Sequence, residues 1–241
     1  GAARNLHQQL VRQNLDNQDA ARRMHAEIRR CAKNERRGLR YLHKTQRQDG
    51  SWLPLWFGNH DEPDDENPFY GTGRILLAAE LGIAPAAIQR AVSYLLSRQN
   101  PDGGWGGGPS RTRWLVDWAG HGGLADTGDL ETVSHCSSVE ETAVVLHGLA
   151  IVLQVALQKH VDLQKHDEPN GELSANPKLI SAIMRGSQCL VDSIRERHHQ
   201  HPWPIGFYFA KLWYHERVYP YVFATEALAA ARGSIQSLRQ K

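Results

Sequence analysis

The sequence predicts an all-α protein built from repeated helical units. Two segments, Arg37 to Trp52 and Arg90 to Trp105, carry Arg, Tyr, Leu, Gln, Asp, Gly and Trp at identical offsets, so they are two copies of one unit. Each copy has apolar residues on one helical face, then a Gln, then an Asp-Gly turn followed by Trp. Strand signals are nearly absent elsewhere. Such units bury their apolar faces only against neighbours, which predicts a solenoid or a closed helical toroid.

We call residues 46–52 and 99–105, which run from the Gln to the Trp of each copy, the clasps. A third, divergent copy begins at Arg185, but Ile194 stands where the Gln is expected and Trp203 arrives a few residues late. The chain therefore holds two complete clasps and one incomplete copy.

The first half of the chain alternates helices with one loop. Residues 3–32 are polar with helical spacing of their few apolar positions, which predicts two amphipathic helices. Helices are expected from Glu35 to Arg47, from Tyr70 to Leu81 and from Pro85 to Arg98, the last with Pro in its first turn. Leu53 to Phe69 is expected to be a loop because its two prolines disfavour a helix.

The second half has fewer but longer elements. A Ser followed by Glu at capping-box distance, within residues 137–141, is typical of a helix start. The expected elements are a Gly/Trp-rich loop over 103–135, a helix from the capping box to about Leu157, a linker over 158–176, a helix from Pro177 to Arg195, and a helix from Phe207 to the C-terminus kinked at Pro220.

Composition excludes several classes of protein. With 241 residues and 41% apolar content the chain can bury a real core, and a net charge of +2 without a Lys/Arg block argues against nucleic acid. The longest apolar run, Ala143 to Leu157, is shorter than the ~20 residues that span a bilayer, so we interpret it as a buried helix. Three separated cysteines indicate neither a disulfide framework nor a zinc knuckle, and favour a reducing compartment.

The chain starts without Met and without a recognisable signal sequence, so we expect a piece of a longer protein. We divide it into a polar helical extension, residues 1–34, and a toroid region, residues 35–241.

The repeated unit, Arg-Gly-x-x-Tyr-Leu-x-x-x-Gln-x-x-Asp-Gly-x-Trp in its first copy, resembles the QW motif of the triterpene cyclases. Three further stretches resemble that family in the same order, so the chain from about Arg36 to Ala231 is similar to the C-terminal part of a bacterial squalene-hopene cyclase. The stretches are Asn67 to Gly73, Gln99 to Gly107 and Pro204 to Pro220.

This resemblance implies an α/α-toroid of the terpenoid cyclase type, here partial, around a lipid-sized aromatic cavity. It implies protonation of a linear triterpene such as squalene and cyclisation through carbocations, without a cofactor. Aromatic faces suit such cations because each ring contributes roughly 0.5–2 kcal/mol when water is excluded. It further implies a peripheral (monotopic) position on the cytoplasmic side of a membrane surface, and the missing N-terminal cyclase region as a partner.

The resemblance also assigns roles to individual residues. Trp56, Trp203, Phe207 and Tyr214 would line the cavity, with Phe207 and Tyr214 on one helical face because they are seven apart. Tyr70 would assist the proton donor. If no gap is placed before it, Lys211 takes a position where hopene-forming cyclases carry an aromatic residue. Its ammonium group would repel a cation. Gln46 with Trp52, and Gln99 with Trp105, would tie neighbouring helices together without taking part in the chemistry.

One family feature is missing from the 241 residues. The family protonates its substrate with an Asp-x-Asp-Asp motif, and the nearest string here is Asp61-Glu62-Pro63-Asp64-Asp65, with the wrong spacing and in a loop. We interpret this string as a solvated surface element. We therefore expect the chain alone not to initiate cyclisation.

Three alternatives remain open at this stage. A toroid fragment without catalytic activity could bind lipid or a partner chain. A protein-prenyltransferase-like toroid would need zinc, yet no Asp-x-Cys occurs, and only a group of histidines with one Cys could act as ligands. A carbohydrate-active α/α barrel would need two carboxylates, but the candidates fit capping better. The zinc candidates are His135, Cys136, His198, His199 and His201; the carboxylates are Glu140 and Glu141.

Overall fold

The computed structural model describes residues 18–111, 136–163, 176–201, 203, 205–207, 212–214 and 216–239, and within this part helices dominate. The α-helices are α2 (Gln18–Thr45), α3 (Pro68–Leu76), α4 (Pro85–Ser97), α6 (Val139–Leu163), α7 (Pro177–Arg195) and α8 (Tyr219–Arg239). Short 3-10 turns are η1 (Pro63–Asp65), η2 (Ala79–Leu81) and η3 (His198–Gln200), and the strands are β1 (Phe57–Gly58), β2 (Ile205–Phe207) and β3 (Leu212–Tyr214).

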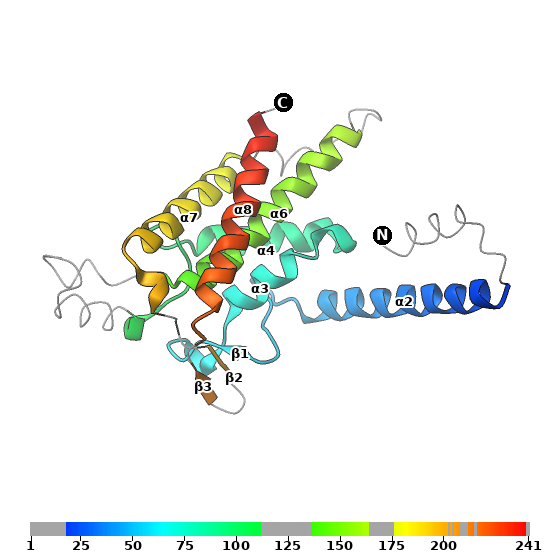
Figure 1. The fold of residues 1–241 in the computed structure, drawn as a ribbon, viewed down its shortest axis with the longest axis horizontal. Coiled ribbons are helices and arrows are strands. Elements are labelled where there is room, and N and C mark those ends of the chain that lie inside the picture. The colour runs from blue at the N-terminus through cyan, green and yellow to red at the C-terminus, as the bar shows by residue number, and fades with distance from the viewer. Residues whose placement is uncertain are drawn as a thin grey trace, which may run out of the picture.

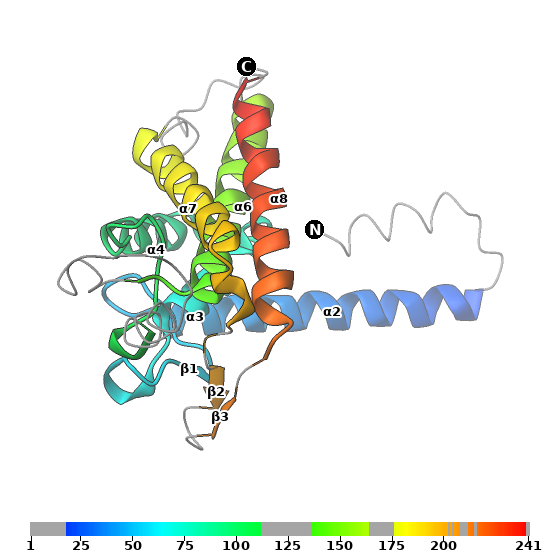
Figure 2. The same cartoon turned by 60° about the vertical axis from the view of Figure 1, so that its left-hand side comes forward.

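Helix α6 forms the centre of the core. It packs against α8, α3, α7 and, less extensively, α4. Figures 1 and 2 both show α6 beside α8, with α7 next to them. By length and composition α6 could cross a membrane over Val139–Gln158, but most of that stretch is buried inside the protein, as expected for a core helix. The prediction of a buried helix over Ala143 to Leu157 is confirmed.

Local sequence signals explain where helices start. Proline occupies the first turn of α3, α4 and α7, where its missing N–H costs nothing. The Asn67 side chain accepts a hydrogen bond from Tyr70 N at the start of α3, and the Asn176 side chain accepts from Lys178 N and Leu179 N at the start of α7.

Helix α2 differs from its prediction. Residues 18–45 form one continuous helix, so no break separates the predicted extension from the first repeat helix at residue 34. Most of α2 projects away from the other helices (Figures 1 and 2). The division into two domains stays a prediction.

The expected helix starting at Phe207 is wrong in its first part. Strands β1, β2 and β3 form a small antiparallel sheet in which Phe57 pairs with Phe207 and Ile205 with Tyr214. Helix α8 begins only at Tyr219. The seven-residue spacing of Phe207 and Tyr214 therefore does not reflect one helical face. Two three-residue strands are too short to give a recognisable alternating pattern.

The all-α class is confirmed within the described residues, and their arrangement is consistent with a partial α/α-toroid. Helices α3 and α8 pack against α6. The helices that carry the repeated unit, α2, α4 and α7, are joined by the clasps described next.

Candidate functional site

The first clasp joins the end of α2 to α4. Gln46 Nε2 donates to Gly50 O at 3.0 Å within the clasp and to Ala87 O at 2.8 Å on α4. Trp52 is 1% exposed, and its Nε1 donates to Leu42 O at 2.7 Å. Gly50 has a φ of +95° and lies against the backbone of the next helix, so the turn excludes a side chain at this position.

The second clasp repeats this geometry one unit later. Gln99 Nε2 donates to Gly103 O at 2.7 Å and to Ala182 O at 3.0 Å on α7. Trp105 is completely buried, and its Nε1 donates to Leu95 O at 2.8 Å. Residues at identical offsets therefore make identical hydrogen bonds, and each clasp connects its own helix to the helix of the following copy.

A threonine on α3 or α6 anchors the backbone of each clasp Trp. Trp52 N donates to Thr72 Oγ1 of α3 at 2.9 Å, and Trp105 N donates to Thr142 Oγ1 of α6 at 2.9 Å. Sequence analysis missed both threonines because neither lies in the repeated unit. Their anchoring role follows only from the three-dimensional packing.

The third copy has a different anchor. Trp203 is 5% exposed, and its N donates to Glu140 Oε1 of α6 at 2.7 Å instead of to a threonine. Its indole stacks on His60 with ring centroids 5.2 Å apart. Ile194, in place of the Gln, is 37% exposed and cannot donate a hydrogen bond. This copy therefore makes no Gln-mediated bond to a following helix.

Two carboxyl groups are buried at the start of α6. Burial raises the pKa of Glu140 to about 7, against the lowering effect of nearby Arg111. Burial also raises the pKa of Glu141, although Ser138, Gly107 and Asn59 all donate hydrogen bonds to its carboxylate. The raised pKa means that the Glu140 carboxyl group keeps its proton over part of the pH range in which an exposed glutamate is ionised.

The capping assignment of these two glutamates holds in part. Glu141 N donates a hydrogen bond to Ser138 Oγ at 3.1 Å, so the predicted cap exists. The Glu141 carboxylate also accepts from Gly107 N at 2.7 Å, and so fastens the Gly-rich loop to α6. The Glu140 carboxylate accepts a hydrogen bond from Trp203 N, which lies outside this cap.

Tyr70 lies in an aromatic cluster beside the small sheet. It is 8% exposed, and its ring is 4.7 Å from that of Phe57 on β1 and 6.4 Å from that of Phe223 on α8. Because Phe57 pairs with Phe207 in the sheet, the backbone of Phe207 also lies at this cluster. Phe57 and Phe223 are aromatic residues that sequence analysis did not select.

Of the other predicted cavity residues, the structure describes the side chains of Trp56 and Trp203. Trp56 is 57% exposed, so it lines no closed cavity in this structure. Trp203 is buried against His60 and Glu140. The side chains of Phe207 and Tyr214, and all of Lys211, lie outside the described residues. The cavity roles of these residues stay predictions.

The acidic loop is packed at Asp61 and Glu62 but exposed at Asp64, so the interpretation as a solvated element holds only in part. Asp61 accepts hydrogen bonds from Ser110 N at 2.9 Å and from Ser110 Oγ at 2.6 Å. Burial raises the pKa of Glu62, and Glu66 pairs with Arg47. Hydrogen-bond partners that are distant in sequence hold this loop against the protein.

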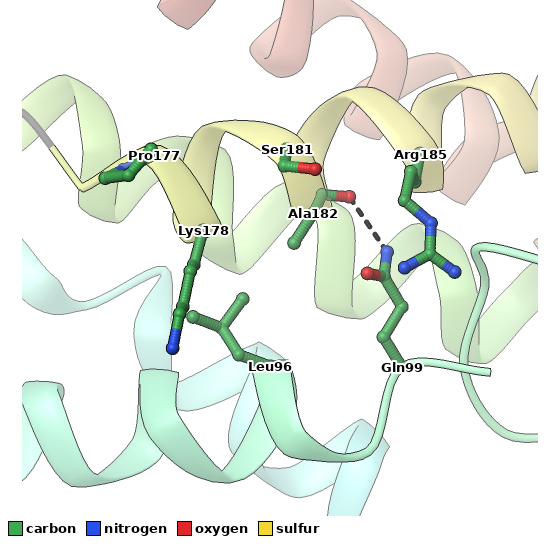
Figure 3. A pocket seen from close by; sticks show the side chains of 7 residues that line it. All are labelled: Leu96, Gln99, Pro177, Lys178, Ser181, Ala182 and Arg185. Carbon is green, nitrogen blue, oxygen red and sulfur yellow. Dashed lines mark hydrogen bonds between the residues drawn. The ribbon is translucent and has the colours of Figure 1, made fainter. Parts of the chain in front are cut away.

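An open pocket of about 360 Å³ lies between α4 and α7, beside the second clasp. Figure 3 shows the Gln99 to Ala182 hydrogen bond in this pocket, with Leu96, Lys178 and Arg185 around it. None of the predicted cavity residues lines it. Across the described ranges, no three His, Cys, Asp or Glu residues are grouped so that they could hold a metal ion.

Comparison with known proteins shows a similarity to one family over part of the chain. Residues 21–123, which contain both clasps and Tyr70, match the model of the squalene-hopene cyclase C-terminal domain. Squalene-hopene cyclases of Zymomonas mobilis and Bradyrhizobium diazoefficiens are 37% and 36% identical over 84 and 83 residues, which are 34% and 33% of this chain. The matched region is therefore similar to the C-terminal domain of squalene-hopene cyclases.

The alignments cover 11% of the length of each of these two relatives. A solved ent-copalyl diphosphate synthase from Streptomyces platensis is similar over 90% of this chain and 29% of its own, with 21% identity and a TM-score of 0.41.

Proposed function

We propose that this chain is a squalene-hopene cyclase-like part of a triterpene cyclase, in which it supplies scaffold and aromatic wall for carbocationic cyclisation of a linear triterpene such as squalene. The observation that carries this proposal is the family match over residues 21–123, the stretch that holds both clasps and Tyr70. The two clasps join α2 to α4 and α4 to α7, which is what a helical wall around a cavity requires.

The aromatic cluster around Tyr70 would carry the function of this chain. The faces of Tyr70, Phe57 and Phe223 would stabilise a cation electrostatically while offering it no strong nucleophile. Tyr70 would in addition position the proton donor. The 241 residues contain no Asp-x-Asp-Asp, so in this proposal the donor lies outside them.

A second candidate function is binding of lipid or a partner chain without chemistry. Leu55 and Trp56, next to the sheet, are 63% and 57% exposed. Adjacent exposed apolar side chains of this size favour contact with a membrane or another chain. Under either function we place the protein at the cytoplasmic side of a membrane.

Incubation with squalene tests the two functions together. The purified chain should retain squalene in a detergent micelle, seen as quenching of tryptophan fluorescence, and should form no cyclic product detectable by mass spectrometry. Replacing Tyr70 with Ala should weaken retention, while the exposed Tyr41→Ala serves as matched control. Cyclic product would contradict the absence of a proton donor. Absence of squalene retention would contradict both the aromatic-wall role and lipid binding.

A further inference from the structure

The open pocket between α4 and α7 has a positively charged wall. Of the seven described residues that line it, Lys178 and Arg185 are cations and none is acidic. Both cations are exposed. Among the described residues, neither forms an ion pair with a carboxylate. The pocket therefore presents two positive charges that no described carboxylate neutralises.

The polar groups of this wall come from one face of α7. Lys178, Ser181 and Arg185 follow one another at intervals of three and four residues, which places them on the same side of a helix. Figure 3 shows the Lys178 side chain extending from α7 toward α4, beside Leu96. The Arg185 side chain extends in the same direction beside Gln99, and Ser181 lies between the two cations. An ammonium group, a hydroxyl group and a guanidinium group thus line one side of the pocket.

The first clasp shows that the lysine is not needed for the clasp itself. Ala87 and Ala182 accept the hydrogen bonds from the two clasp glutamines. Lys178 lies four residues before Ala182, whereas the residue four before Ala87 is Ile83, which is 8% exposed and part of the core. Both clasps form although these two residues differ in charge and burial. Lys178 therefore adds a positive charge that the repeated geometry does not require.

The guanidinium group of Arg185 is held in place beside the pocket. Its Nη2 donates to Asn100 O at 3.0 Å and to Pro101 O at 3.2 Å. A guanidinium group has five N–H donors in one plane, and these bonds use one of its nitrogens. The planar donor set matches the oxygens of a phosphate or a carboxylate. Arg185 is therefore oriented in advance for an oxyanion.

We propose that this pocket binds a small phosphate monoester with a short apolar group. The phosphate, with a charge of about −1.5 to −2 near neutral pH, lies between Lys178 and Arg185 and accepts a hydrogen bond from Ser181 Oγ. The apolar group packs against Leu96 and the buried Ala182. Two cations attract a dianion more strongly than the single charge of a carboxylate or a phosphodiester. The pocket volume of about 360 Å³ is within the range for small-molecule sites.

A ligand in this pocket contacts both helices that the second clasp joins. Because such a ligand binds the folded protein and not the unfolded chain, it should also raise the melting temperature. The site contains no residue of the aromatic cluster around Tyr70. This inference is therefore independent of cyclase chemistry, and failure of either test leaves the other proposal standing.

Isothermal titration calorimetry of the full chain with n-butyl phosphate, at constant ionic strength, tests the ligand class. We expect saturable binding to one site. Di-n-butyl phosphate and butyrate, each with one negative charge, should bind at least roughly fivefold more weakly. Inorganic phosphate should also bind more weakly, because it lacks the apolar group. Absence of saturable binding, or equal binding of the diester, would overturn the proposal, and equal binding of inorganic phosphate would overturn its apolar part.

Matched protein variants locate the ligand. Lys178→Gln removes one charge from an exposed side chain, so it should fold and should weaken butyl phosphate binding at least roughly tenfold. Ser181→Ala removes one hydrogen bond and should weaken binding roughly threefold. Arg195→Gln, an exposed cation of the same helix outside the pocket, should bind as the unaltered chain does. Undiminished binding by Lys178→Gln, or an equal loss in Arg195→Gln, would overturn the proposal.

Discussion

The first and second repeats share their local geometry and differ in their surroundings. Trp52 and Trp105 make the same hydrogen bonds at 1% and 0% exposure. The helices that precede them diverge, since α2 projects outward and leaves Tyr41 half exposed, whereas α4 buries Tyr94 against Phe69 and the core. A sequence repeat therefore specifies the turn and its hydrogen bonds, while burial depends on whether a neighbour packs on the helix.

Among the substitutions that test this comparison, Trp105→Ala should lower the stability of the protein most. It removes a completely buried indole, so we expect the free energy of unfolding to fall by about 3–5 kcal/mol. Trp52→Ala should cost a similar amount because its burial is the same. Urea denaturation measures both. A loss below about 1 kcal/mol for either variant would show that the two clasps are not equivalent.

The paired tyrosines test the role of surroundings directly. Tyr94→Ala should cost about 3 kcal/mol, because it removes a ring packed against Phe69 and beneath Arg98. Tyr41→Ala, at the same repeat position, should change stability by less than about 0.5 kcal/mol. Spectrophotometric titration should also show one tyrosine with a pKa near the value of about 12 that burial gives Tyr94. Equal losses in the two variants would mean that α2 is covered in solution.

The third copy differs from the other two in having a titratable anchor. The backbone N–H of its Trp203 donates to Glu140, whereas those of Trp52 and Trp105 donate to threonines. Burial raises the folded-state pKa of Glu140 from 4.5 to about 7, so between these values the folded protein holds a proton that the unfolded chain has lost. The free energy of unfolding should therefore fall as the pH rises from about 4.5 to about 7. Glu140 alone should account for a fall of about 2–3 kcal/mol.

Glu140→Gln should remove most of that slope. The Gln side chain keeps an oxygen that can accept from Trp203 N but does not titrate. Thermal melts of both proteins between pH 5 and pH 8 measure the difference, with Glu226→Gln, a half-exposed carboxyl on α8, as control. A slope that survives in Glu140→Gln would assign the effect to another group.

The clasp glutamines should have an intermediate effect. Gln99→Ala removes two hydrogen bonds and leaves two carbonyl oxygens without that donor, so we expect a loss of about 2 kcal/mol. Gln46→Ala should cost a similar amount. Chemical denaturation checks both, with the exposed Gln188→Ala on α7 as control. An unchanged midpoint for Gln99→Ala would contradict the stabilising role of the clasp.

Replacing Gly38 and Gly186 with Ala should change the stability of the protein in opposite directions. Gly38→Ala should stabilise the protein by about 0.5–1 kcal/mol, because Ala is the better helix former and the site is open. Gly186→Ala should destabilise it, because the new methyl group meets the Trp105 ring. Differential scanning calorimetry of the pair measures the signs. Destabilisation by Gly38→Ala would show that α2 is already packed at this face.

Local sequence signals determined much of this protein: the first-turn prolines and Asn caps that start α3 and α7, and the two Asp-Gly turns with their bonded Gln and Trp, all act over a few residues. Only the tertiary structure decided the rest. Phe207 lies on a strand because Phe57, 150 residues earlier in the chain, pairs with it, and Asp61 is packed because Ser110 donates to it. Such partners are distant in sequence, so neither periodicity nor motif spacing reports them.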